Sequence, residues 1–262
     1  MVTGAPGWLG TALVSALRGR GREVVCLVRP GAEARELRRL GAEIVPCDLR
    51  DPDSVRGCCD AVGTVFHCAG VIHSLGVREM WRTNAGGTTN LVEEACRAGV
   101  GRFVHVSSSS AAGANKSRNR PMDERDPARP GCAYGRSKLA AETAVLAACR
   151  RGRLPATVIR PCWFYGPGQP ARQTGFMSMI GTGRPLIFGD GRNLRSLSRV
   201  DSVVEALLLA ESRDAAVGRV YWIADRRPYP VIEIYETIAT LLGVRRLRPM
   251  RCRAASMRMM RS

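Results

Sequence analysis

The sequence predicts an α/β fold built on a doubly wound parallel sheet, followed by a smaller C-terminal lobe. Short runs rich in β-branched residues alternate with longer amphipathic stretches through the first two-thirds of the chain. This alternation is typical of buried parallel strands that are connected by helices. Beyond about residue 162 the alternation loosens and Gly and Pro accumulate, which predicts a separate lobe.

The individual elements follow from these patterns in chain order. Only Met1 and Val2 precede the first glycine-rich turn, so the first strand is expected to be short. Later buried strands are predicted at 23–28, 42–47, 63–70, 101–108 and 156–161. Helices are predicted between them at 10–21, 31–41, 51–59, 88–99 and 134–152, several of which end at glycine. The last third adds a helix at 202–212, a strand near 219–224 and a helix at 231–243.

Composition narrows the class of protein. The formal net charge is +17, but seven arginines fall in the acid-free segment 245–262, and the others are dispersed without an aromatic stacking platform. Binding to nucleic acid is therefore not expected. The ten cysteines are scattered without CxxC pairs, as expected for reduced thiols in the cytoplasm. No apolar run reaches the length of a membrane span, and no signal peptide is recognised at the N-terminus.

The first turn carries a phosphate-binding pattern. In "VTGAPGWLG" the glycines Gly4, Gly7 and Gly10 lie between a strand and a helix. Glycines in this context allow a tight turn and a close approach of the backbone to a pyrophosphate, while the helix N-terminus attracts negative charge. The pattern predicts a dinucleotide site, with a structural glycine turn as the alternative.

Two further residues bear on which dinucleotide is bound. Arg29 ends the second strand, where an acidic residue would favour NAD. A guanidinium accommodates a 2′-phosphate, so NADP(H) is favoured over NAD(H). Asp48 ends the third strand and could accept a hydrogen bond from the adenine amino group, or it could be a solvated loop residue.

The stretch "YGRSK" holds the strongest catalytic candidates. Tyr134 and Lys138 are four residues apart and share a helix face. Lys138 is one of only two lysines in a chain that otherwise uses arginine, the other being Lys116. A tyrosine that acts as a base near neutral pH needs its pKa lowered by about 3 units, and a nearby ammonium favours the phenolate.

The order of motifs resembles that of an extended short-chain dehydrogenase/reductase of the NAD-dependent epimerase/dehydratase family. The matching segments are "TGAPGWLG", "DL", "HCAG", Asn84 in "NAGGTTNLVEEA", "VSSSSAAG", "YGRSK", "RPCWFYGPG" and "GDGRNLRSLSRVDSVVEALL". The resemblance implies a Rossmann-type domain over 1–163, to which 194–223 returns. It further implies a small substrate-binding lobe formed by 164–193 and 224–250, and we expect a disordered tail over 251–262.

The resemblance also implies roles for individual residues. Ser108, selected by its distance from Gly113, would polarise the substrate oxygen beside Tyr134 and Lys138, with Ser109 as the second choice and a substrate contact. Arg195 would hold a diphosphate of the substrate. The cofactor would be bound by Gly4, Gly7, Trp8, Leu9, Gly10, Arg29, Asp48, Leu49, Cys68, Ala69, Gly70, Asn84, Tyr134, Lys138 and Pro161.

Departures from the family pattern limit the reaction. The family's 4,6-dehydratases carry Asp and Glu where this chain has Ser109 and Ser110, which argues against sugar dehydration. The aromatic residue usual before the closing glycine is replaced by Ala112. The favoured function is an NAD(P)-dependent oxidoreductase or epimerase that acts on a secondary alcohol or ketone, with a nucleotide sugar as the expected substrate class.

Two alternatives stay open. One is a ketone reductase similar to dihydroflavonol reductases or 3β-hydroxysteroid dehydrogenases, favoured by "LVRP" and "YGRSKLAAETAVLAA". The other is an inactive dinucleotide-binding regulator, although such proteins typically lose the Tyr and Lys pair. The expected partner is a small-molecule substrate, without nucleic acid, membrane or bound metal, and a homodimer is left open.

Overall fold

The computed structural model describes residues 1–72, 76–115, 117 and 120–252, and these fall into two compact units. The first unit comprises Met1–Phe164 and Val200–Ile223, and the second comprises the remaining segments, from Tyr165 to Arg199 and from Ala224 onward. The chain therefore leaves the first unit after Phe164 and returns at Val200. The sequence had placed 194–199 in the first unit, whereas β9 (Leu194–Arg195) pairs with β12 (Tyr229–Pro230) in the second.

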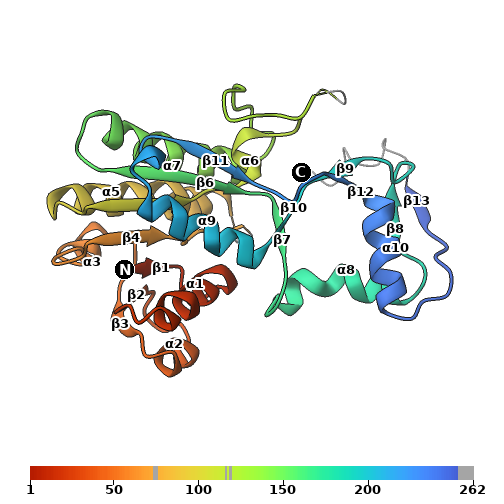
Figure 1. Cartoon of the computed structure of the whole chain (residues 1–262), viewed down its shortest axis with the longest axis horizontal. Coiled ribbons are helices and arrows are strands. Elements are labelled where there is room, and N and C mark those ends of the chain that lie inside the picture. Colours follow the sequence, from red (N-terminus) through yellow and green to blue (C-terminus); the bar gives the residue numbers. More distant parts are fainter. Residues whose placement is uncertain (73–75, 116, 118–119, 253–262) are drawn as a thin grey trace. The chain divides into compact units, whose positions relative to one another are not determined.

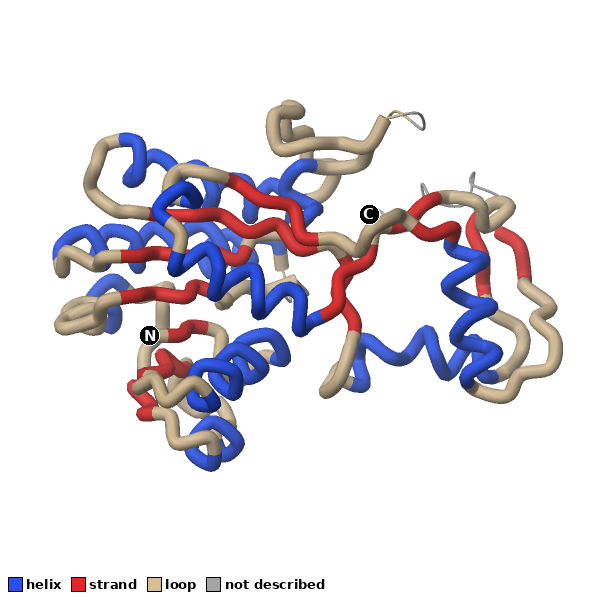
Figure 2. The backbone as a smooth tube through the Cα atoms, in the orientation of Figure 1, coloured by secondary structure: helices blue, strands red, loops and turns tan. Residues whose placement is uncertain are grey.

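The first unit is a seven-stranded sheet in which all strands run parallel (Figures 1 and 2). The strand order is β11-β6-β5-β4-β1-β2-β3. The strands are β1 (Val2–Thr3), β2 (Val25–Val28), β3 (Glu43–Pro46), β4 (Thr64–His67), β5 (Arg102–Val106), β6 (Ala156–Pro161) and β11 (Val220–Ile223). Each strand predicted for this unit is present; β6 has the predicted bounds 156–161, and β2, β3, β4, β5 and β11 are slightly shorter than predicted. The doubly wound parallel sheet is thus confirmed.

Helices cover both faces of the sheet because successive strand residues point to opposite sides. On β5, Val104 packs in the cluster that includes α1 (Trp8–Gly19) and α9 (Val200–Ser212). Its neighbour Phe103 packs in the cluster that includes α5 (Gly87–Arg97) and α7 (Ala133–Arg150). Both faces of the central strands are therefore dry, which explains their continuous apolar sequence.

The remaining elements of the first unit lie mostly in the connections. Three short helices are α2 (Arg35–Arg39), α3 (Pro52–Val55) and α6 (Ser109–Ala112). The sequence analysis did not predict α4 (Val77–Trp81) or the π-helical turn η1 (Arg82–Gly86) that leads into α5. A 3₁₀ turn, η2 (Asp214–Ala216), precedes β11.

The strand order reverses direction at β1, which has β2 on one side and β4 on the other. Connections leave β1 and β4 on opposite faces, so the carboxyl ends of these two strands open a crevice. Parallel α/β sheets bind ligands at this point. The loops after β1, β2, β3, β4 and β5 carry most of the predicted site residues.

The second unit is smaller and contains short strands and two longer helices. The chain enters it along β7 (Trp163–Tyr165), and its own elements are α8 (Ala171–Gly181), β8 (Leu186–Phe188), β9, β10 (Leu197–Arg199), β12, α10 (Val231–Leu241) and β13 (Met250–Cys252). Phe176 of α8 stacks on Tyr235 of α10 with ring centroids 6.4 Å apart. None of the described helices is long and apolar enough to cross a membrane.

The beginning of the expected tail is ordered. Met250, Arg251 and Cys252 form β13, which pairs in parallel with β8, and the Met250 amide donates to Pro185 O over 2.9 Å. The prediction of disorder is therefore wrong for residues 251 and 252, because backbone pairing needs no apolar side chains. Residues 253–262 lie outside the described part of the chain.

Candidate active site

The turn after β1 is shaped by backbone contacts that only glycine permits. Gly4 has φ of +70°, and a Cβ there would lie 2.6 Å from the amide nitrogen of Ala69. A Cβ on Gly10 would lie 2.6 Å from both Ala5 Cα and Gly4 O. These contacts bring the first turn against the loop after β4 and against helix α1. The predicted pattern of close packing is therefore present at Gly4 and Gly10.

The N-terminus of α1 suits an anion. Gly7 occupies its N-cap position, no side chain caps the helix, and no acidic residue lies in its first turn. Trp8 opens the helix half-buried, with its ring 5.0 Å from that of Phe164, and Leu9 is buried. The positive end of the helix dipole thus faces the crevice without a competing carboxylate. The described residues fit a dinucleotide pyrophosphate.

Arg29 and Asp48 lie after β2 and β3. Arg29 is exposed. Asp48 accepts hydrogen bonds from Arg50 Nε over 2.9 Å and from the Arg50 amide over 3.0 Å. Hydrogen bonding by Arg50, aided by the charges of Arg50 and Arg29, lowers the pKa of Asp48 to about 2. The Asp48 carboxylate is thus held by Arg50, which also pairs with Glu79 of α4. An adenine amino group that binds Asp48 would share this carboxylate with Arg50.

The loop after β4 meets the catalytic helix at Gly70. A Cβ on Gly70 would lie 3.5 Å from Asn84 Oδ1 and 3.6 Å from Lys138 Nζ. Burial raises the pKa of the half-buried Cys68 thiol to about 12. The thiol is therefore neutral and unreactive near neutral pH.

Tyr134 and Lys138 project from the same face of α7, as their spacing predicts. Lys138 is 2% exposed, and its Nζ donates to Val106 O over 2.8 Å. Burial lowers the pKa of Lys138 to about 8. The half-buried Tyr134 side chain lies beside Ser108, which opposes the effect of burial on the pKa of the phenol. Burial raises the pKa of Tyr134, opposite to the predicted direction, because the phenol is desolvated in the protein alone.

Ser108 is held in place by the start of α6. It is the N-cap residue, and its Oγ accepts from the Ser110 amide over 3.1 Å. A Cβ on Gly135 would lie 2.1 Å from Ser110 O, so α7 approaches α6 as closely as backbone allows. Ser109 follows, half-buried, in α6. The close packing of the two helices therefore explains why "YGRSK" has a glycine at position 135. A residue without a Cβ lets Tyr134 approach Ser108.

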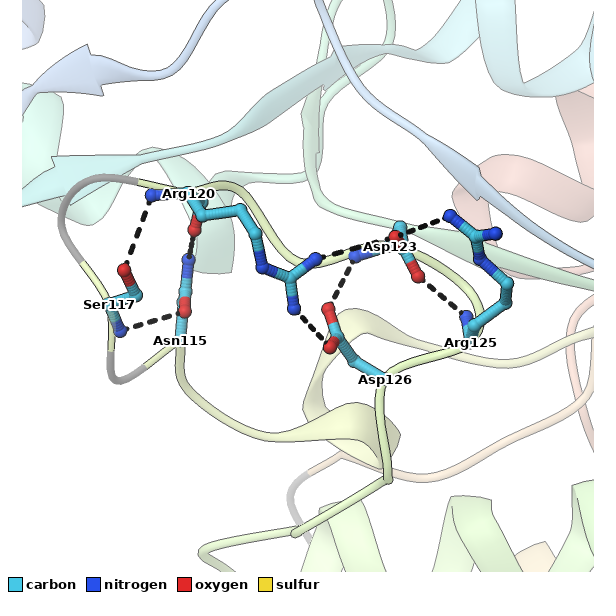
Figure 3. A network of polar contacts seen from close by, with 6 residues as sticks. All are labelled: Asn115, Ser117, Arg120, Asp123, Arg125 and Asp126. Carbon is cyan, nitrogen blue, oxygen red and sulfur yellow. Dashed lines mark hydrogen bonds and ion pairs between the residues drawn. The ribbon is translucent and has the colours of Figure 1, made fainter.

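A polar clasp closes the long loop between Ser108 and Tyr134 (Figure 3). Arg120 pairs with Asp126 and Asp123, and the Asp123 amide donates to Asp126 Oδ2 over 2.8 Å. The loop is also fixed to the edge of the sheet, because Glu124 Oε1 accepts from the amide of Trp222 on β11 over 2.9 Å. The described part of the loop between α6 and α7 is thus anchored at several points.

Asn84 is wholly engaged with protein groups. It is 0% exposed, and its amide exchanges two hydrogen bonds with the backbone of Val71, of 2.7 and 2.9 Å. Its Nδ2 also donates to Ser137 Oγ over 3.0 Å. The π-helical turn η1 places this side chain between the loop after β4 and α7. Asn84 therefore links Val71 to Ser137, the chain neighbours of Gly70 and Lys138, and a direct contact with cofactor stays a prediction.

Sequence reasoning missed a buried hydrogen-bonded chain behind Lys138. The Ala69 amide donates to Thr3 Oγ1 over 3.3 Å, and Thr3 Oγ1 lies 2.7 Å from His67 Nδ1. His67 Nε2 lies 2.8 Å from Thr88 Oγ1, which donates to Asn84 O. Because Thr88 uses its proton for Asn84, His67 donates from Nε2 and accepts at Nδ1. Burial lowers the pKa of His67 to about 3, so the ring is neutral.

Three other residues of this region were also overlooked. His105 pairs with His67 across β4 and β5, their ring centroids are 5.1 Å apart, and neither ring nitrogen of His105 has a hydrogen-bond partner. Glu142 of α7 and Arg160 of β6 form a buried ion pair. Two features of the sequence could have identified these residues: polar residues within apolar strands, and a glutamate four residues after Lys138.

Two further predicted residues belong to other elements. Pro161 ends β6 and is buried in the first unit. Arg195 is exposed on β9 of the second unit, so its contact with a substrate diphosphate stays a prediction. The described residues contain no group of three or more His, Cys, Asp or Glu side chains that could hold a metal ion.

Comparisons with known proteins agree with this geometry. The model of the NAD dependent epimerase/dehydratase family matches residues 1–224. An uncharacterized protein of Sinorhizobium fredii, y4nL, is 40% identical over 92% of this chain and 72% of its own length. A 4-hydroxy-2-methyl-3-oxo-4-farnesyl-3,4-dihydroquinoline-1-oxide ketoreductase of Stigmatella aurantiaca is 31% identical, over 92% of this chain and 71% of its own.

Solved structures show the same fold. The structure of MoeE5 in complex with UDP-glucose and NAD is 32% identical, with a TM-score of 0.79, covering 97% of this chain and 84% of that one. The structure has a glycine-rich turn where the strand order reverses, and it brings Ser108, Tyr134 and Lys138 together. Both features agree with the family match. The chain belongs to the NAD-dependent epimerase/dehydratase family.

Proposed function

We propose that the protein is an NAD(P)-dependent oxidoreductase or epimerase in which Tyr134 exchanges the proton of a substrate hydroxyl or carbonyl. The observation that carries this proposal is the position of Ser108 beside the Tyr134 phenol, one helical turn from buried Lys138. A proton donor and a second hydrogen-bonding group beside one oxygen are what the oxidation of an alcohol or the reduction of a ketone requires.

Each of the three residues has a distinct task. Tyr134 gives a proton to the substrate oxygen or takes one from it. Ser108 Oγ orients and polarises that oxygen. The Lys138 ammonium has three donors and gives one to Val106 O, which leaves donors for a ribose hydroxyl. Its positive charge also favours the phenolate.

The dinucleotide is proposed to bind with its pyrophosphate at the N-terminus of α1. When bound, the nicotinamide would give a hydride to the substrate carbon in a reduction or accept one from it in an oxidation. Arg29 is exposed at the end of β2 and adds positive charge there. NADP(H) is therefore proposed over NAD(H), since no acidic side chain replaces the guanidinium at this position.

Affinity should depend on pH through Lys138. Its ammonium loses the proton as the pH rises through about 8. The neutral amine is a weaker partner for both the ribose and the phenolate. Cofactor affinity should therefore be highest below pH 8 and decline above it.

A nucleotide sugar is the proposed substrate class. The likeness to MoeE5, whose structure holds UDP-glucose and NAD, supports this proposal. A ketone is the second candidate, supported by the likeness to the ketoreductase of Stigmatella aurantiaca. Sugar dehydration is not proposed, because Ser109 and Ser110 follow Ser108 in α6 and provide no carboxylate for elimination.

Tyr134→Phe tests the catalytic assignment. The substitution removes one hydroxyl, so fluorescence titrations with NADPH and NADH should change by no more than about twofold. Turnover should fall by about 10² or more. Turnover is assayed at 340 nm with β-ketoesters and NADPH, and by chromatography of UDP-glucose incubated with NAD⁺ or NADP⁺. The matched control is Tyr221→Phe, an exposed tyrosine on β11.

The outcome separates the candidate functions. Epimerised UDP-sugar supports the nucleotide-sugar proposal, and oxidation of NADPH by ketoesters supports the reductase. If a substrate is turned over by Tyr134→Phe at the wild-type rate, Tyr134 is not the proton donor. Tighter binding of NADH than of NADPH would contradict the role of Arg29.

A further inference from the structure

Helix α7 presents three ionisable side chains on successive turns of its buried face. Tyr134, Lys138 and Glu142 are spaced four residues apart, so they lie one above another along the helix. Lys138 and Glu142 are 2% and 1% exposed. Charged groups are rarely buried this deeply unless other charges or hydrogen bonds compensate them.

Glu142 is fixed by a bidentate partner from the sheet. Arg160 Nε donates to Glu142 Oε1 over 2.9 Å, and Arg160 Nη2 donates to Oε2 over 2.6 Å. Arg160 is 5% exposed and its guanidinium lies 5.8 Å from the ring centroid of Trp222. The carboxylate is therefore held rigidly between α7 and β6, close to the Lys138 turn.

Within the part of the chain that the structure describes, the other ionisable groups that face Lys138 carry no charge near neutral pH. His67 on β4 and His105 on β5 both have pKa values far below their usual range because they are buried. Burial also raises the pKa of Cys68 and of Tyr134, which keeps the thiol and the phenol neutral. Among the groups that act on Lys138, Glu142 is the one carboxylate, and it opposes the lowering of the pKa of Lys138 by burial.

We propose that Glu142, clamped by Arg160, is a positioning residue that supplies the counter-charge keeping the buried Lys138 ammonium protonated. The role of the Lys138 charge toward Tyr134 and a cofactor rests on the proposed function. The effect of Glu142 on the protonation of Lys138 does not depend on that function. A purely structural ion pair between α7 and β6 is the competing explanation. The two explanations predict different changes in the pKa of Lys138 when Glu142 or Arg160 is replaced.

Removing either partner gives opposite electrostatic effects. In Glu142→Gln, Lys138 loses its counter-charge while the Arg160 cation stays, so the pKa of Lys138 should fall by about one unit or more, a tenfold loss of protonated lysine above that pKa. In Arg160→Gln, the carboxylate is released from its partner, so the pKa of Lys138 should rise. Damage to packing alone would act in the same direction in both variants, because both break the same pair.

The chain makes this measurement direct, because it contains only two lysines. Protein labelled with ¹³C at lysine Cε is titrated by NMR between pH 6 and 11, in the absence of cofactor. Lys116→Arg removes one of the two signals and assigns Lys138. In the wild type, the Lys138 signal should titrate near 8. Circular dichroism establishes that each variant is folded.

The result decides the proposal in each case. A lower pKa of Lys138 in Glu142→Gln, without a lower pKa in Arg160→Gln, supports it. An unchanged or raised pKa in Glu142→Gln, or a lowered pKa in both variants, overturns it. If Glu142→Gln does not fold, Arg160→Gln decides alone: a raised pKa supports the proposal, and an unchanged or lowered one contradicts it.

This test is independent of catalysis. The titration needs neither substrate nor cofactor, so it can succeed even if Tyr134→Phe shows that the proposed reaction is wrong. Conversely, the enzyme could be catalytically competent while the pKa of Lys138 stays unchanged in Glu142→Gln. That result would support the proposed function and contradict only this inference.

Discussion

Single glycines decide whether the cofactor turn can form. Gly4 combines a positive φ with direct contact to the amide of Ala69, and Gly10 touches the backbone of Gly4 and Ala5. Gly19 lies in the same helix as Gly10 and has nothing within 4 Å of its would-be Cβ. All three residues are glycines, but adding a methyl group would destabilise the protein only at Gly4 and Gly10. At these two positions the added Cβ would meet backbone atoms of the turn or of the loop after β4.

Gly4→Ala should therefore destabilise the protein by about 2–4 kcal/mol, because it combines left-handed backbone strain with overpacking. Affinity for NADPH should fall by roughly tenfold or more, since the turn must move. Urea unfolding and fluorescence titration measure the two effects. Gly19→Ala is the control, and its free energy of unfolding should be unchanged or higher by up to about 1 kcal/mol. Equal behaviour of the two variants would show that the turn tolerates a side chain.

Elements, rather than single residues, set the distance between the catalytic groups. Ser108 belongs to the start of α6 and Tyr134 to the first turn of α7, and the loop between them is closed by the polar clasp of Figure 3. The two helices touch through backbone at Ser110 and Gly135. The distance between Ser108 and Tyr134 thus depends on how closely these elements pack.

Gly135→Ala should separate α6 from α7 and weaken the Ser108 contact with Tyr134. The new Cβ would meet Ser110 O at 2.1 Å, which predicts a destabilisation of about 1–3 kcal/mol. Turnover should decline more than the affinity for cofactor, because the α1 turn is not involved. Gly131→Ala is the matched control, since nothing lies within 4 Å of its would-be Cβ. A variant with wild-type turnover would mean that the helices adjust without moving Tyr134.

At the scale of the whole molecule, the fold is discontinuous in sequence. Val200–Ile223 returns to the first unit, where α9 packs in the cluster with α1 and β11 pairs with β6. The sheet edge and one of its covering helices thus come from late in the chain. Stability of the first unit should depend on residues beyond the intervening segment.

Leu207→Ala tests this organisation. Leu207 is 0% exposed in α9, so its truncation should cost about 2–5 kcal/mol. The loss should appear as a lower urea midpoint for the transition that also releases bound NADPH. Leu241→Ala in α10 removes the same atoms from a side chain that is 81% exposed, and should change stability by less than about 0.5 kcal/mol. Similar losses in both variants would argue against α9 as part of the first unit's core.

The sequence by itself determined the class of fold and the family. Alternating apolar runs placed the strands because parallel strands are dry on both faces, and the glycine turn and the Tyr134 and Lys138 pair are local patterns with fixed spacing. Local spacing could not reveal that Tyr134 is desolvated in the protein alone or that Asp48 is held by Arg50.

Only the tertiary structure decided the surroundings of Lys138. His67, His105 and Arg160 come from three different strands, and they reach α7 because the strand order places β4, β5 and β6 side by side. Contacts between residues distant in sequence depend on register and crossover, which a single sequence does not display. The second unit shows the same limit: β13 forms where composition predicts a tail, because its backbone finds a partner in β8.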